Sequence, residues 1–273
     1  MVAMINTADL VKSETLEGLV DSEHLLARTA SERYGHYYFH AREATVLLST
    51  CITSVDITRV NFARFFSYTK KHHLLAMLST IRLHKVQAAM DLRQALEASA
   101  WAAYALAHTD QSYFVEERGD GALHSPNRLT AARNKWLAGH FSAGSAVIKE
   151  YKDRINETAA HAGLVYSHQA LTIDEAAGVF DMPFFDKEDL FHVYSDLWLL
   201  GSIGISIMDL LFGVKEHFDP PIEFEADFPD RFTALYDQNK LLRQELHNTP
   251  RHKRIDARVK AARAKAALGT ATE

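Results

Sequence analysis

The sequence is nearly free of cysteine. Cys51 is the single cysteine among 273 residues, so the chain cannot form an intrachain disulfide bond. Such a composition fits a reducing compartment, and the apolar and β-branched neighbours of Cys51 favour a small core residue over a nucleophile. The first residues carry acidic side chains and no continuous apolar segment, which does not fit a secretory signal. We therefore expect a cytoplasmic protein.

Several motifs of common enzyme classes are also missing. The sequence contains no GxGxxG, no GxxxxGK followed by Ser or Thr, no HExxH, no GxSxG and no CxxC. Dinucleotide binding, P-loop nucleotide hydrolysis, zinc hydrolysis and serine-hydrolase chemistry therefore lack support. We expect no cofactor and no bound metal.

One pattern keeps a metal site open as an alternative. His36 and His40 are four residues apart, and Glu32 and Glu43 lie on roughly the same helical face. A di-metal bundle normally draws ExxH motifs from two helices, and no second motif is visible. The neighbouring aromatic residues favour a packing or interface region instead.

Glycine and proline are absent between Gly35 and Gly119, and this absence predicts long helices. We expect an all-α, multi-helix bundle with long central helices and one small β-hairpin within residues 164–185. A Thr-, Ser- and Val-rich stretch around Cys51 weakens the second helix, because β-branched side chains lose rotamer freedom in helices. The expected helices cover residues 7–33, 36–66, 74–107, 127–138, 143–161, 187–217, 230–247 and 251–268.

The charge is unevenly distributed along the chain. The net charge is −5, yet residues 251–273 hold seven Lys or Arg and two Asp or Glu. We expect residues 1–250 to form a single helical bundle domain, followed by a basic helix or tail at 251–273. The tail is typical of either a solvated terminal helix or a contact with RNA or a membrane.

One apolar segment, Leu197–Val214, is long enough to cross a membrane, but it carries Asp209. Small residues at Gly201 and Gly204 would let neighbouring helices approach closely. We interpret the segment as a buried core helix and expect no membrane association.

Two polar groups on helices could carry a function. Arg93 and Glu97 are four residues apart on an otherwise apolar face, which predicts either an internal ion pair or inter-helix tie, or a side chain that reaches a neighbouring site. Arg154 and His161, seven residues apart, also share one helical face. Arginine can hold a phosphate, and histidine can move a proton near neutral pH.

The Arg154–His161 spacing resembles the motif of the HEPN superfamily (higher eukaryote and prokaryote nucleotide-binding domains). The stretch from Arg82 to Leu106 is similar to the long helix of uncharacterised bacterial HEPN-like proteins. The resemblance covers about residues 74–212. One residue departs from the motif, because Ile155 occupies the place of the usual polar residue after the arginine.

The resemblance implies a metal-independent ribonuclease of a toxin or phage-defence type, acting as a homodimer. It implies that Arg154 and His161 are catalytic and that Glu97 orients one of them. RNA and an antitoxin-type protein are then the expected partners. The alternative is a non-catalytic helical interaction or dimerisation protein, in which the same polar residues only order the bundle.

Overall fold

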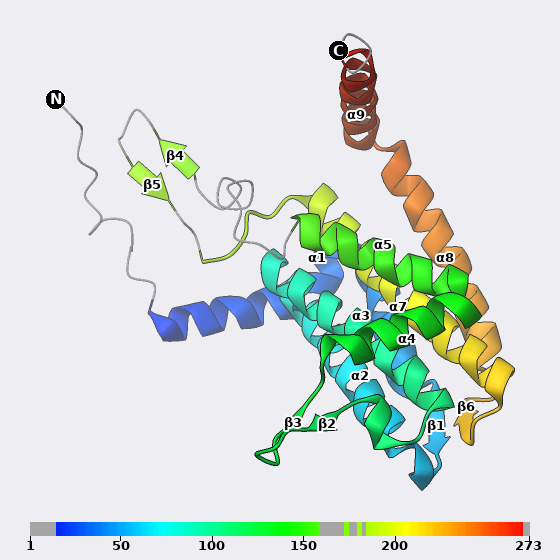
Figure 1. Ribbon diagram of the computed structural model, residues 1–273. Coiled ribbons are helices and arrows are strands. Elements are labelled where there is room, and N and C mark those ends of the chain that lie inside the picture. Colours follow the sequence, from blue (N-terminus) through cyan, green and yellow to red (C-terminus); the bar gives the residue numbers. More distant parts are fainter. Residues whose placement is uncertain (1–14, 159–171, 175–178, 182–183, 270–273) are drawn as a thin grey trace.

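The computed structural model describes residues 15–158, 172–174, 179–181 and 184–269. Most of these residues are helical, so the predicted all-α fold class is confirmed (Figure 1). The helices are α1 Leu16–Thr50, α2 Val60–Ile81, α3 Lys85–Ala107, α4 Asn127–His140, α5 Ser142–Thr158, α7 Leu190–Phe218, α8 Phe228–Asn248 and α9 Pro250–Gly269.

The strands form three antiparallel pairs. These are β1 Ile52–Val55 with β6 Ile222–Phe224, β2 Glu116–Glu117 with β3 Leu123–His124, and β4 Thr172–Asp174 with β5 Val179–Asp181. The last pair confirms the hairpin predicted within residues 164–185. The predicted helix over 36–66 is wrong after Thr50, because the β-branched residues that weaken it form strand β1 instead.

The predicted helix over 74–107 is also wrong, because the chain breaks between α2 and α3. Leu83 has a φ of 62°, a left-handed conformation that a leucine rarely adopts. Asp186 supports the break from a distant part of the sequence. Its N–H donates to the Leu83 carbonyl at 2.9 Å, and its carboxylate accepts from the Lys85 N–H at 2.6 Å. That carboxylate therefore stands in for the N-cap that α3 lacks.

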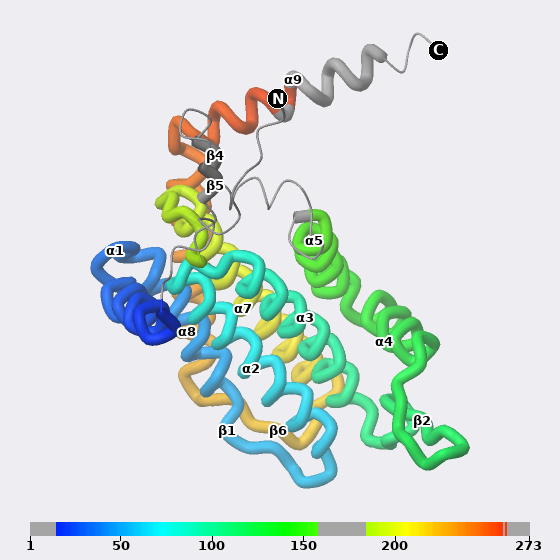
Figure 2. Tube along the Cα trace, turned by 90° about the vertical axis from the view of Figure 1, so that its left-hand side faces the viewer, coloured from blue at the N-terminus to red at the C-terminus, as the bar shows by residue number. Residues whose placement is uncertain are grey.

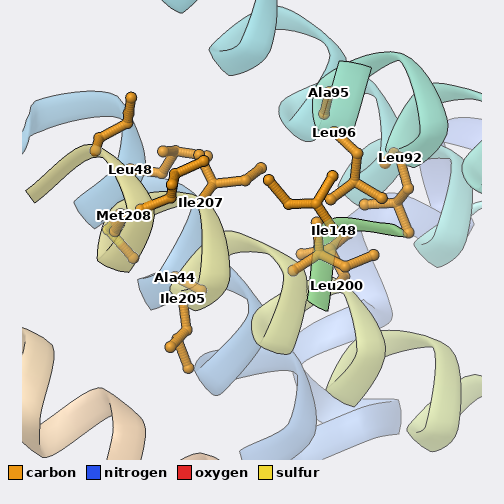
Figure 3. Packing of buried hydrophobic residues seen from close by; sticks show 14 of the residues in the cluster. Ala44, Leu48, Leu92, Ala95, Leu96, Ile148, Leu200, Ile205, Ile207 and Met208 are labelled. Carbon is orange, nitrogen blue, oxygen red and sulfur yellow. The ribbon is translucent and has the colours of Figure 1, made fainter. Parts of the chain in front are cut away.

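Helix α7 lies at the centre of the bundle and packs against α1, α2, α3, α5 and α8. Figure 3 shows Ile148 of α5 beside Leu96 of α3 and Leu200 of α7. Among the described residues α7 is the one helix with the length and hydropathy to cross a membrane, and 67% of its most apolar window is buried. Its packing accounts for its apolar sequence. Asp209 is exposed on its surface.

Two histidines fill notches in α7 that glycines leave open. A Cβ on Gly201 would lie 2.6 Å from Nε2 of His40, and a Cβ on Gly204 would lie 2.9 Å from Nε2 of His73. The His73 ring donates to the Leu200 carbonyl at 3.1 Å. The small residues therefore admit side chains from α1 and α2, and burial lowers the pKa of His73 to about 4.

The histidine face of α1 packs against α8. His36 contacts Glu245 at 2.9 Å, His40 contacts Asn239 at 3.0 Å, and Glu43 pairs with Arg231 at 2.9 Å. In the part of the chain that the structure describes, no group of three metal-ligating side chains occurs. These polar residues instead fix α1 against α8.

The aromatic run of α1 is largely internal. Tyr34 and Tyr37 are buried, Tyr37 stacks on Tyr194 with ring centroids 4.6 Å apart, and Phe39 remains 54% exposed. Helix α1 is kinked at Gly35, whose φ of 50° needs glycine. Helix α9 projects from the end of the bundle beyond α8 (Figures 1 and 2).

Candidate functional site

A cleft of about 490 Å³ lies between α3, α4 and α5. Figure 2 shows α4 and α5 meeting at a corner alongside α3. We call this feature the α4–α5 cleft, and its lining is rich in cations and amides. The lining residues are Arg93, Ala100, Arg133, Asn134, Leu137, Ala138, Ser145, Ile148, Lys149, Lys152, Asp153 and Asn156.

Arg133 anchors the α4 wall of the cleft. It is fully buried, and its guanidinium lies over the Trp101 ring at 4.4 Å from the centroid. Its Nη2 donates to Glu97 at 2.8 Å and to the Asn134 side chain at 2.8 Å. A buried guanidinium needs such partners, because an unpaired buried charge is costly. Burial lowers the pKa of Arg133, and the Glu97 charge opposes that shift.

Glu97 joins both walls of the cleft to α3. One carboxylate oxygen accepts from Arg133, and the other binds Lys152 of α5. Burial raises the pKa of Glu97, but Lys152 and Arg133 outweigh burial, so the pKa lies below its ordinary value. Glu97 is therefore an ionised inter-helix tie. The structure selects this interpretation over an ion pair with Arg93.

Arg93 is half-buried and lines the same cleft. Its Nε is buried and has no hydrogen-bond partner among the described residues. A buried donor without an acceptor is costly. The rest of the half-buried guanidinium lies at the cleft, where a ligand with anionic oxygens could bind it. Arg93 is thus a cation available to a ligand in the cleft.

Helix α5 presents different residues on different faces. Ile148 and Ile155 are buried in the core. Lys149, Lys152 and Asn156 line the cleft, and Lys149 pairs with Asp153 one turn away. The spacing of three and four residues produces this cationic stripe beside the apolar one.

Arg154 is exposed near the end of α5, on a face that does not line the cleft. Burial raises the pKa of Asp196 to about 6, while the positive charges of Lys85 and Arg154 lower it. The Lys85 Nζ lies 3.7 Å from that carboxylate. Arg154 therefore lies close to an acidic group on α7. Glu97 binds Arg133 and Lys152 instead, and His161 lies outside the described residues.

Comparison with known proteins found no relative: no protein-family model, no curated protein and no solved structure matches the chain.

The sequence alone did not single out Arg133, Lys149 or Lys152. A signal was present, because α4 contains Arg128, Arg133 and Lys135 and no acidic residue. Such a helix differs from α5, where Lys and Arg alternate with Asp and Glu. A helix whose Lys and Arg residues are not balanced by Asp or Glu is typical of an anion-binding surface.

Proposed function

We propose that this protein is a metal-independent ribonuclease that binds single-stranded RNA along α5, with part of the backbone in the α4–α5 cleft and the scissile phosphate outside the cleft, at the end of α5 that carries Arg154. The observation that carries the proposal is the cationic lining of the cleft, above all the guanidinium of Arg93, which has a buried Nε with no hydrogen-bond partner in the described part of the chain. The type of reaction, metal-independent RNA cleavage, is inferred from the HEPN-like spacing of Arg154 and His161.

The charge balance of the cleft favours a phosphodiester backbone. Four cationic side chains line it, namely Arg93, Arg133, Lys149 and Lys152, and Asp153 is the acidic residue in the same lining. Glu97 neutralises part of this charge through Arg133 and Lys152. The remaining positive charge would attract RNA despite the net charge of −5, since binding depends on local charge.

In the proposed reaction the ribose 2′-OH attacks the adjacent phosphorus and the bond to the 5′-oxygen breaks. His161 transfers the protons, and Arg154 stabilises the negative charge on the phosphorane. Glu97 acts as a positioning residue, because it fixes Arg133 and Lys152 on the two walls of the cleft. The products are a 2′,3′-cyclic phosphate and a 5′-hydroxyl, so no metal is required.

The test compares wild type with Arg154→Ala and His161→Ala on an unstructured RNA in EDTA, together with the melting temperature. Each substitution should lower cleavage by about 10²–10⁴-fold. Arg42→Ala, an exposed arginine on α1, is the matched control and should cleave like wild type. Equal cleavage by all four proteins would indicate a contaminating nuclease and contradict the assignment.

A second candidate function is that of a non-catalytic interaction protein, and a groove favours it. The groove holds about 530 Å³ and is lined by residues that include Tyr37, Phe191, Tyr194 and Leu246. We propose a second copy as its occupant, because two-fold dimers are the commonest oligomers. Light scattering should give a mass twice 30.7 kDa. A monomeric mass together with capture of an antitoxin-type partner would assign the groove to that partner instead.

A further inference from the structure

An aromatic cluster covers the corner where α4 meets α5 and the end of α7. We call it the corner cluster, and it consists of Trp136, His140, Phe141, His217 and Phe218. Trp136 stacks on Phe218 at 5.6 Å and on His140 at 5.0 Å between ring centroids. His217 contacts Phe218 at 4.5 Å and Phe141 at 5.8 Å.

The outer rings of this cluster face solvent. His140 and His217 are exposed, and Phe218 is 38% exposed. Trp136 is half-buried because Tyr104 of α3 and His108, the residue that follows α3, pack against it with ring centroids 5.3 Å away. The cluster thus has an internal side that holds the rings in place and an outer side with open ring surface.

The corner cluster is continuous with the α4–α5 cleft. Leu137 and Ala138, near the end of α4, line the cleft, and so does Ser145 near the start of α5. His140 and Phe141 lie between these residues in the chain. The Phe141 N–H donates to the Leu137 carbonyl at 2.8 Å, and the Phe141 carbonyl accepts from the Ser145 N–H at 2.8 Å. The rings therefore begin where the lining of the cleft ends, about one to two helical turns from Arg133 and Lys149 in the chain.

The charge of α4 and the aromatic rings of the corner cluster together indicate which ligand can bind at this corner. Helix α4 carries three cations and no acidic residue, and its exposed Lys135 directly precedes Trp136. His140 donates its Nδ1–H to the Trp136 carbonyl at 2.9 Å, which fixes the exposed ring. Fixed rings beside cations match a strand whose phosphates alternate with flat, unpaired bases.

We infer that the corner cluster is a stacking platform for unpaired bases of single-stranded RNA, with Phe218 and His140 as the rings in contact. The inference rests on the proposed function, since it assumes that the cleft holds the phosphates of the same strand. It adds a base-binding site at the α4–α5 corner. Because every base has a π-face, the platform selects single strands over duplexes rather than one sequence.

The experiment measures binding without cleavage. A fluorescein-labelled 2′-O-methyl RNA of about 12 nucleotides lacks the attacking hydroxyl, so its anisotropy reports affinity whether or not the protein is a nuclease. The comparison includes the same strand as a duplex and a strand with abasic sites. The proteins are wild type, Phe218→Ala, His140→Ala and Phe39→Ala, the last an exposed phenylalanine on α1.

Removal of one stacking ring should weaken binding of the single strand about 5- to 100-fold. Phe39→Ala should bind like wild type. Abasic sites should weaken wild type by a similar factor and Phe218→Ala much less, because the two changes remove the same contact. Retained melting temperatures separate this effect from unfolding, and His140→Ala serves if Phe218→Ala does not fold.

Three results would overturn the inference. The first is wild type that does not bind the strand, and the second is equal binding by wild type, His140→Ala and Phe218→Ala. The third is a change in oligomeric mass in Phe218→Ala with no change in RNA affinity, which would assign the rings to a protein partner. Cleavage is a separate readout. Loss of cleavage in Arg154→Ala with intact strand binding would support the proposed function and would leave the stacking platform untouched.

Discussion

Helix α7 and helix α5 both border polar side chains, but with opposite outcomes. On α7 the notches at Gly201 and Gly204 enclose His40 and His73, and burial lowers the pKa of both histidines. On α5 the lysines that line the cleft remain charged. Lys152 is bound to Glu97, while Lys149 stays exposed.

This difference separates polar residues that stabilise the fold from polar residues that are available to bind a ligand. A neutral histidine in a glycine notch completes the packing, so its replacement should change stability. A cation beside an open cleft lacks full compensation, so its replacement should change binding. Substitutions at the notches should therefore change stability most, and substitutions at exposed cations of the cleft should change it least.

The first prediction concerns acid and the α7 notches. Because the pKa of His73 is about 4 when folded and about 6.5 when unfolded, the unfolded chain takes up the proton first as the pH falls. Stability is therefore intact above pH 6.5 and decreases toward pH 4, by about 3 kcal/mol from this group. Urea unfolding across this range measures the decrease.

The control for acid sensitivity is His73→Asn, which should unfold with a flatter pH dependence than wild type, whatever its stability at pH 7. Carboxylates titrate equally in both proteins, so the difference isolates the histidine. Identical pH profiles would contradict the assignment of acid sensitivity to His73.

The second prediction concerns the space in the notch. Gly201→Ala places a Cβ 2.6 Å from the fixed His40 ring and should lower stability by about 1–3 kcal/mol. Helix propensity alone would predict the opposite sign, because alanine is more favourable than glycine within a helix by about 1 kcal/mol. Gly139→Ala is the matched control, because nothing lies within 4 Å of its Cβ, and it should stabilise the protein. Thermal unfolding of both variants gives the comparison.

The third prediction moves to the cleft wall. Glu97→Gln removes the negative charge that compensates the buried Arg133, and we expect stability to fall by about 1–2 kcal/mol, moderated by the partial exposure of Glu97. Arg93→Gln should leave stability nearly unchanged, since Glu97 does not bind Arg93. Equal destabilisation by both substitutions would show that the two residues act as a pair after all.

The sequence was sufficient for the helical fold because its signals are local. The lack of glycine and proline between Gly35 and Gly119, together with Pro220–Pro221, placed most of the described helices within a few residues. The β-branched stretch marked the weak point that became β1. The end predicted for α5 before Gly163 lies outside the described residues. The break at Leu83 had no local signal. It depends on Asp186, about a hundred residues away, which binds both sides of the break.

The candidate site was predicted less well for the same reason. The i,i+4 spacing correctly marked Glu97 as polar on an apolar face, but its partners lie on α4 and α5. Helical spacing reveals neighbours on one helix only. Arg133 was the missing partner, and nothing in its own helix indicates that it is fully buried.

The last prediction has the smallest effect on stability and the most direct bearing on function. Lys149 lines the cleft but is exposed and pairs with Asp153 within one helical turn, so Lys149→Ala should not change the melting temperature. Its charge should still matter for RNA, because each phosphate that a cation neutralises releases counterions and steepens the salt dependence of binding. We expect weaker binding and a shallower slope of log affinity against log salt, by about 0.7 for one fewer phosphate neutralised on a single strand. Lys71→Ala, an exposed lysine on α2, is the control and should keep the wild-type slope. An unchanged slope in Lys149→Ala would remove the cleft from the RNA path, whereas a changed slope in both variants would mean that the charge acts at long range and not through direct binding in the cleft.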